Sequence, residues 1–394
     1  MHDDDPFGFD SLDLGWLRAK QGVKWHRSRG ELLAAWVADM DFPAPTVVTD
    51  ALRAYVDRAD LGYADFRNGT GLAELFAGRM AARHGWAPDP SLVHDVCDVV
   101  QGVRMVVHLM TQPGDGIAFH TPAYPPFHAT VADMGRPLTP IWGERDGTGW
   151  RFDLERFEAD LTTAPSGRPC RVLVLCNPHN PTGHVFTRTE LEALAQVVLG
   201  HDLLVISDEI HAELTFDARR HIPFASLGDD VAARTVTLTS ATKSFNLAAI
   251  RCAVLHAGAP AVHAALAALP SHLFGAVSPF GVLATTVAWT QADDWQAAVV
   301  RRLSENRHVL ARLLAERPAL AAIDYAVPEA TYLAWLDCRP LGLAEEPVEV
   351  FRAGAVELSP GPDFGEQGVG FVRLNLATSP PVLTAIADAM AAAV

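Results

Sequence analysis

The chain has 394 residues, a length that favours two domains because a single compact core rarely grows to this size. Hydrophobic residues make up 49% of the chain and charged residues 20%, a composition that excludes a disordered protein. The formal net charge of −16 excludes the basic field that attracts phosphates, so we expect neither a nucleic acid nor an anionic membrane as a partner.

The cysteines and the first residues indicate a cytoplasmic protein. The five cysteines are odd in number and show no C-x-x-C spacing, so buried thiols are expected rather than disulfides. The acidic start of the chain lacks the apolar segment of a signal peptide. No apolar run reaches about 18 residues, the minimum for a membrane-spanning helix. We therefore predict a soluble protein in a reducing compartment.

The first elements are an arm and two helices. Residues 1–45 are rich in Gly, Pro, Trp and Asp and are predicted to form an N-terminal arm that packs with a small C-terminal domain. A helix is predicted from Thr46, because apolar residues recur at helical spacing up to Tyr55. A second helix is predicted to open at Gln101-Gly102-Val103-Arg104 and to end at Pro113-Gly114.

The middle of the chain alternates strands and helices. Continuous apolar, β-branched runs predict buried strands at residues 172–176, 203–207 and 235–239. Thr187 and Glu190 form a capping box that starts a helix running to Gly200. This alternation predicts an α/β fold with a mostly parallel central sheet covered by helices on both faces.

The last part of the chain predicts a smaller α+β domain. A long helix is expected from Asp294 to about Glu316, short strands follow from Pro328, and a last helix follows Pro380. We therefore divide the chain into the arm (1–45), a large domain (46–285) and a small C-terminal domain (286–394).

Four short motifs place polar groups directly after strands. They are Asn-Pro-His-Asn-Pro-Thr-Gly at 177–183, Ser-Asp-Glu-Ile-His at 207–211, Ser-Ala-Thr-Lys-Ser-Phe-Asn at 240–246 and Arg-Leu-Asn at 373–375. Ligands of parallel sheets bind beyond the carboxyl ends of the strands, so these motifs are expected to meet at one edge. Together they supply an amide, a carboxylate, an amine and a guanidinium. An amino-acid enzyme that uses pyridoxal 5′-phosphate (PLP) needs these four groups.

Lys243 and Asp208 are the central catalytic candidates. A lysine that forms a Schiff base must be held in place and be neutral at times, and Lys243 lies between Thr242 and other polar residues after a strand. Asp208 ends a buried strand, where its charge needs a cation, and a protonated pyridine nitrogen would serve. The alternatives are a surface lysine in a loop and an aspartate that caps the next helix.

Three further residues are candidates to contact the cofactor ring. Asn180 can donate a hydrogen bond to its phenolic oxygen, although Asn-Pro is also a common turn. His211 lies three residues after Asp208 and either supports the ring or is a packed, hydrogen-bonded histidine. Tyr124 is either a stacking residue for the ring or a core aromatic.

Anion sites are predicted for the phosphate and for the substrate carboxylate. Gly102, Val103 and Arg104 at a helix start offer backbone N–H groups to a phosphate, and Ser240 and Arg251 could complete that site. Arg373 can fork onto a substrate α-carboxylate, with a structural ion pair as the alternative. No spacing of His, Cys, Asp and Glu resembles a metal site.

At this point the chain resembles the fold-type I PLP enzymes of the class I/II aminotransferase superfamily. Within it, the chain is most similar to the bacterial cystathionine β-lyase and cysteine C–S lyase group (MalY/PatB type). Besides the motifs above, the segments that carry this resemblance are Trp36-Val37-Ala38-Asp39-Met40-Asp41-Phe42, Leu61-Gly62-Tyr63, Leu175-Cys176, His221-Ile222-Pro223, Thr331-Tyr332-Leu333-Ala334-Trp335-Leu336-Asp337 and Pro360-Gly361.

The resemblance implies several further features. It implies PLP as cofactor, Lys243 as the Schiff-base lysine and a homodimer with active sites shared between subunits. Tyr63 would reach the PLP phosphate of the neighbouring subunit, and Ala38 and Asp39 would line the substrate site. The chain departs from the group's pattern at Thr242, where Ser is usual. It departs again in the turn that contains Arg104, and Arg251 resembles the aminotransferases instead.

The leading hypothesis is β-elimination from L-cystathionine or another S-substituted L-cysteine to a thiol, pyruvate and ammonia. The alternative is a PLP-dependent aminotransferase that acts on an L-amino acid with the same residues; Arg251 favours it and the arm motif opposes it. A third hypothesis is a non-catalytic binding protein on the same fold. The joint presence of Lys243, Asp208 and Arg373 argues against that.

Overall fold

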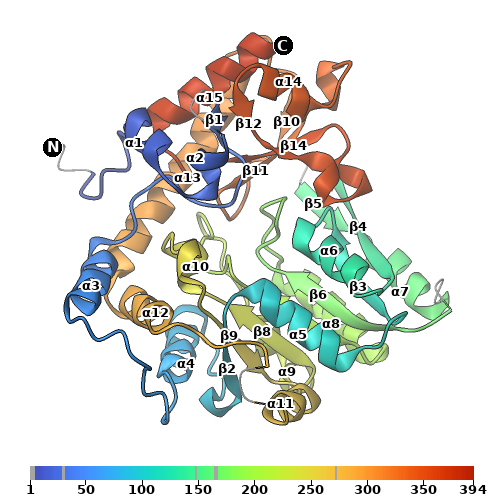
Figure 1. The fold of residues 1–394 in the computed structure, drawn as a ribbon. Helices are drawn as coiled ribbons and strands as arrows, with labels where there is room; N and C mark the ends of the chain where they lie inside the picture. Colours follow the sequence, from blue (N-terminus) through green and yellow to red (C-terminus); the bar gives the residue numbers. More distant parts are fainter. Residues whose placement is uncertain (1–4, 29–31, 147–148, 164–166, 271–272) are drawn as a thin grey trace.

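An eight-stranded sheet forms the centre of the larger part of the protein (Figure 1). The structure is a computed structural model, and it describes residues 5–28, 32–146, 149–163, 167–270 and 273–394. The pairs β8–β7, β7–β6, β6–β3 and β3–β4 are parallel, whereas β8–β9, β9–β2 and β4–β5 are antiparallel. In spatial order the strands are β2 (Val93–Val96), β9 (Ala253–Ala257), β8 (Thr235–Thr239), β7 (Leu204–Asp208), β6 (Cys170–Cys176), β3 (Gly116–Thr121), β4 (Leu138–Asp146) and β5 (Gly149–Phe152).

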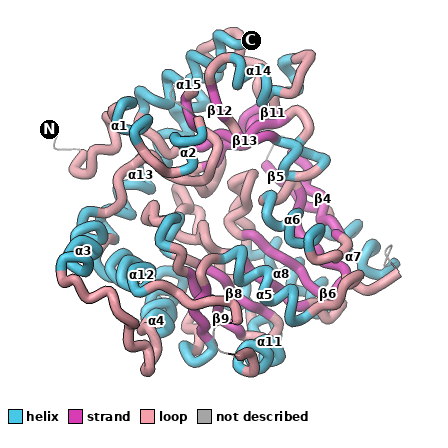
Figure 2. The backbone as a smooth tube through the Cα atoms, in the orientation of Figure 1, coloured by secondary structure: helices cyan, strands magenta, loops and turns pink. Residues whose placement is uncertain are grey.

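Helices cover both faces of this sheet (Figure 2). On β6, Val172 and Val174 pack into one apolar cluster, and the intervening Leu173 packs into another on the opposite face, as the alternation of a strand requires. The first cluster includes residues of α5 (Val99–Met110), α6 (Pro125–Asp133) and α11 (Pro260–Ala267); the second includes α7 (Leu154–Thr163) and α8 (Arg188–Gly200). The predicted α/β class with a mostly parallel sheet is confirmed.

A smaller antiparallel sheet follows in the C-terminal part. Its spatial order is β10 (Asp324–Tyr325), β11 (Leu333–Asp337), β14 (Phe371–Asn375) and β13 (Ser359–Pro360). Other helices are α3 (Thr46–Asp57), α4 (Leu72–His84), α9 (Asp229–Ala232), α10 (Ala241–Ser244), α12 (Pro279–Gln291), α13 (Asp293–Ala315), α14 (Pro347–Ala353) and α15 (Pro380–Ala393). The boundary predicted at residue 285 falls inside α12, and the domain division itself stays a prediction.

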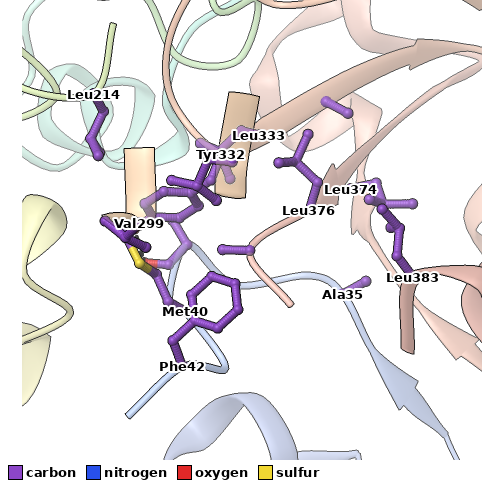
Figure 3. Close-up of a cluster of buried hydrophobic side chains, with 14 of the residues drawn as sticks. Ala35, Met40, Phe42, Leu214, Val299, Tyr332, Leu333, Leu374, Leu376 and Leu383 are labelled. Atoms are coloured by element: carbon purple, nitrogen blue, oxygen red, sulfur yellow. Dashed lines mark hydrogen bonds between the residues drawn. The ribbon is translucent and has the colours of Figure 1, made fainter. Parts of the chain in front are cut away.

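The N-terminal segment lies against the small sheet. It contains α1 (Leu14–Ala19), α2 (Val23–Arg27) and β1 (Leu33–Ala34), and β1 pairs in parallel with β12 (Val356–Glu357). Figure 3 shows Met40 and Phe42 in one apolar cluster with Tyr332 of the small domain region and Val299 of α13. This packing fixes the backbone of residues 36–42 beside the sheet edge described below.

Several predicted elements agree with the structure to within a residue or two. Both hydrogen bonds of the capping box at Thr187 and Glu190 are present, and α3 and α13 begin at Thr46 and Asp293. None of the five cysteines forms a disulfide. Within the described residues, no helix has the length and apolar character needed to cross a membrane.

Candidate active site

The carboxyl ends of β6, β7 and β8 meet at one edge of the large sheet. Cys176 lies opposite Asp208, and Asp208 lies opposite Leu238. The backbone N–H of Asn177 donates to the carbonyl of Asp208 at 3.0 Å. The chain therefore turns away from all three strands at the same edge, as parallel pairing requires.

A cavity of about 830 Å³ opens at this edge. It brings together residues from the arm, α5, α10 and the strand ends. The predicted site residues that line it are Ala38, Arg104, Tyr124, Asn180, Asp208, His211, Thr242, Lys243 and Arg251. Six predicted site residues do not line it: Asp39, Tyr63, Gly102, Val103, Ser240 and Arg373.

Lys243 projects into the cavity from α10. The hydroxyl of Ser240 caps this helix by accepting from the N–H of Thr242 at 3.1 Å. The Lys243 amine donates to the carbonyl of Ala38 at 2.5 Å. Its removal from solvent lowers the pKa of Lys243 to about 8, and the positive charge of Arg373 acts in the same direction. Near neutral pH the amine therefore has an appreciable neutral fraction.

Asp208 is a buried carboxylate at the end of β7. Burial raises its pKa to about 7, although the nearby Lys243 opposes this shift. One carboxylate oxygen accepts from the N–H of Ile210 at 3.1 Å, and no described residue forms an ion pair with Asp208. A buried acid of this kind is poised to receive a cationic ligand group.

Arg373 of β14 is buried behind the cavity with no acidic partner among the described residues. It donates to the side-chain oxygen of Asn180 at 3.0 Å, to the carbonyl of Trp36 at 3.1 Å and to the hydroxyl of Ser359 at 3.2 Å. Burial lowers the pKa of Arg373 to about 10, and its Nε has no hydrogen-bond partner in the part of the chain that the structure describes. The guanidinium is thus held in place while its charge remains uncompensated.

Aromatic residues and His211 form the walls of the site. Tyr124 precedes α6, and burial raises the pKa of its hydroxyl. His211 is buried, its Nδ1 has no hydrogen-bond partner among the described residues, and desolvation lowers its pKa to about 3. The ring is therefore neutral near pH 7.

Ser240 and Arg251 were predicted to bind the phosphate, but in the structure both contact other groups of the protein. The Ser240 hydroxyl donates to the carbonyl of Cys252 at 2.5 Å, so this hydroxyl is already used within the fold. Arg251 lies at the rim of the cavity and forms an ion pair with Asp98.

The predicted start of α5 is wrong by two residues. The helix begins at Val99, because Asp98 is its N-cap and accepts from the N–H of Gln101 at 2.7 Å. The N–H of Gly102 already donates to the carbonyl of Asp98 at 3.1 Å, so it is not free for a phosphate. Val99 and Val100 are the first two residues of the helix, so their N–H groups have no partner within it. Both residues line the cavity.

Gly102, Val103 and Arg104 therefore lie further along α5 than predicted. Gly102 packs on Leu238 of β8: a Cβ built on it would lie 2.4 Å from a methyl carbon of Leu238. Val103 is buried in the core. Arg104 forms an ion pair with Asp133 at 2.8 Å while still lining the cavity.

The Gly102→Ala variant tests this packing role. An alanine would favour the helix by about 1 kcal/mol, but the clash with buried Leu238 is expected to make the protein less stable by about 1–3 kcal/mol. Urea unfolding measures the change. Gly78→Ala in α4 is the matched control, because nothing lies within 4 Å of its added Cβ, and it should be neutral or stabilising. Unchanged stability with weaker PLP binding would instead support a phosphate role for Gly102.

The arm contributes backbone rather than side chains to the site. The carbonyl of Ala38 accepts from Lys243 and also from the Tyr332 hydroxyl at 3.1 Å. Asp39 does not line the cavity, but its negative charge raises the pKa of Lys243 against the effect of burial. Tyr63 is fully exposed in the single chain.

Several residues that hold the predicted site residues in place were not predicted from the sequence. Trp36, Ser359 and Tyr332 had no predicted role, although two of them lie in the quoted motifs. Asp98 was also missed, and its N-cap position directly before an apolar run was the signal that could have found it. No group of three or more potential metal ligands occurs in the described parts of the chain.

The family model for "Aminotransferase class I and II" matches residues 76–390. The chain belongs to this family. One relative is the cystathionine beta-lyase PatB of Bacillus subtilis, which is 34% identical to this chain over 91% of this chain and 93% of PatB.

Two solved structures of the same fold extend the comparison. A putative PLP-dependent beta-cystathionase from Corynebacterium diphtheriae matches with a TM-score of 0.89 and 31% identity, over 98% of this chain and 99% of that one. The PLP-bound C–S lyase from Staphylococcus hominis matches with a TM-score of 0.88 and 26% identity, over 98% of this chain and 97% of that one. The predicted resemblance to fold-type I PLP enzymes of the cystathionine β-lyase group is confirmed.

Proposed function

We propose that the protein is a PLP-dependent C–S β-lyase that cleaves L-cystathionine or another S-substituted L-cysteine to a thiol, pyruvate and ammonia. The observation that carries this proposal is the cavity that Lys243 and Asp208 line together, with Arg373 unpaired behind it. The lyases among the related proteins support it.

The residues of the cavity fit PLP. Asp208 is a buried acid that forms no ion pair with any described residue, which suits a protonated pyridine nitrogen. His211 lines the same cavity with a neutral ring. The N–H groups of Val99 and Val100, with Arg251 at the rim, suit the phosphate. Lys243 is the residue that would hold the cofactor covalently, and Tyr124 would flank its ring.

Bound PLP supplies an electron sink for the negative charge that develops at the substrate Cα when its proton is removed. Lys243 is the base for that proton, because its amine has a pKa of about 8 and lies inside the cavity. Asp208 holds the proton at the ring nitrogen by its charge. The carbonyl of Ala38 accepts a hydrogen bond from the lysine amine and so orients it within the cavity.

Arg373 and Asn180 are proposed to orient the amino acid. Arg373 would receive the substrate α-carboxylate, since its hydrogen bonds to Trp36 and Ser359 fix the guanidinium without neutralising it. Asn180 accepts from Arg373 through its oxygen, which leaves its amide N–H groups as donors for the phenolic oxygen of the cofactor.

A product assay on the PLP-loaded protein tests the proposed function. L-cystathionine and S-methyl-L-cysteine are supplied without a keto-acid acceptor, and pyruvate and free thiol are measured. Equal amounts of pyruvate and thiol are expected over many turnovers. Failure to release pyruvate, with transfer of the amino group to the cofactor, would show an aminotransferase instead.

We also propose a cytoplasmic homodimer. The five unpaired cysteines support a reducing compartment. The exposed Leu61 and Tyr63 support a partner surface, because Tyr63 contributes nothing to the site of its own chain.

A further inference from the structure

A second cavity, of about 440 Å³, lies between α4, α13 and the segment that follows β7. Figure 1 shows α4 and α13, and the lining of this cavity shares no residue with that of the active-site cavity. Three arginines contribute to it: Arg83 at the end of α4, Arg220 after β7 and Arg301 of α13.

The positive charge of this cavity is only partly compensated. Arg83 donates to Asp293 at 2.5 Å, and Glu213 of the lining is paired with Arg79 at 2.5 Å. Arg220 and Arg301 are exposed and have no acidic partner among the described residues. Two free guanidinium groups at one cavity, in a chain with a net charge of −16, mark a local site for an anion.

Two histidines with unused nitrogens line the same cavity. His221 is buried and its Nε2 contacts the carboxylate of Glu209 at 2.9 Å, while its Nδ1 has no hydrogen-bond partner in the described structure. His84 packs edge-on against His221 at 5.1 Å between ring centroids, and its Nε2 is also unpartnered. Both nitrogens are buried within the wall, and the His221 side chain has no exposed surface, so the groups that can reach a ligand in the cavity are the guanidinium groups.

We propose that this cavity binds a phosphate group, either as inorganic phosphate or as a small phosphate ester. Arg220 and Arg301 supply both the charge and the hydrogen bonds, and the two histidines form part of the cavity wall. Each planar guanidinium group can contact two oxygens of one phosphate, whereas a chloride ion is a single atom and cannot form such a paired contact. The site is separate from the one proposed for the PLP phosphate and does not depend on the proposed reaction.

Equilibrium dialysis of the PLP-loaded protein tests the proposal. The probes are inorganic phosphate and glycerol 3-phosphate, each measured at an ionic strength held constant with chloride. Loading with PLP keeps the cofactor's own phosphate site filled. One phosphate per chain is expected to bind. The Arg220→Ala/Arg301→Ala double variant should weaken binding by at least roughly tenfold, because hydrogen bonds to charged groups contribute about that factor or more.

Arg312→Ala is the matched control, since Arg312 is an exposed arginine on the same helix but outside the cavity. It should bind phosphate as the wild type does, and melting temperatures without phosphate should agree among the three proteins. Tighter binding of one probe identifies free phosphate or an ester as the better ligand. No binding at millimolar phosphate, or equal binding by the wild type and the double variant, would overturn the proposal.

Discussion

Replacing Lys243 with alanine is expected to lower the rate of pyruvate release from L-cystathionine by at least about 10²–10⁴-fold, the contribution of a positioned general base. The structure offers no substitute, because only three lysines occur in the chain and Lys20 and Lys24 belong to the arm. Lys24 is paired with Asp41, and Lys20 donates to the Asp41 carbonyl at 2.6 Å. Neither lysine lines the cavity.

The small number of lysines also makes the experiment specific. Borohydride treatment of the PLP-loaded protein, followed by mass spectrometry of its peptides, should place the cofactor on the peptide that contains Lys243. Lys20→Ala is the control, and it should keep both the modified peptide and the activity. Circular dichroism checks that the Lys243→Ala variant is folded. Pyruvate release near the wild-type rate by that folded variant would refute the role proposed for Lys243.

The sequence predicts the parts of this site that depend on local pattern. The ends of β6, β7 and β8 come together because parallel strands present their carboxyl ends at one edge, and Asn180, Asp208 and Lys243 lie at or shortly after these ends. Arg373 was also predicted to follow a strand, but it lies within β14 of the antiparallel sheet. The capping box before α8 is likewise a local signal, set by two side chains three residues apart.

The contacts between distant segments were not predictable in this way. Ser359 donates to the carbonyl of Trp36, 323 residues away, and both groups hold Arg373. No spacing rule links such positions, because the pairing of β1 with β12 brings the arm and the C-terminal part together. The misplaced start of α5 is different in kind: the helix was predicted to open at Gln101, whereas the N–H of Gln101 donates to Asp98, which makes Asp98 the N-cap.

Asp208→Asn is expected to reduce activity by roughly 10²- to 5 × 10³-fold, which corresponds to the about 3–5 kcal/mol lost when one partner of a buried ion pair is removed. The asparagine keeps the shape of the side chain but cannot hold a proton at the cofactor's ring nitrogen by charge. Steady-state kinetics with L-cystathionine measures the change. Asp57→Asn on α3 is the control, since Asp57 is exposed and outside the cavity, and it should leave activity unchanged.

Asp208→Asn is also expected to stabilise the PLP-free protein at alkaline pH. Burial raises the pKa of Asp208 to about 7, above the ordinary value near 4 of an unfolded aspartate. The folded state therefore binds the proton more tightly, and the stability that this contributes is full below about pH 4 and is lost as the pH rises through 7. The loss is at most about 4 kcal/mol, and the uncharged amide of the Asp208→Asn variant would not incur it.

Urea unfolding of the two PLP-free proteins at pH 5 and pH 8 checks this expectation. The difference in the free energy of unfolding, variant minus wild type, should be larger at pH 8 than at pH 5. A variant that is more stable at pH 8 yet nearly inactive would show that Asp208 is kept for its charge toward a ligand and not for the fold. An unchanged difference between pH 5 and pH 8 would mean that Asp208 is already ionised at pH 5, with its charge balanced within the protein itself.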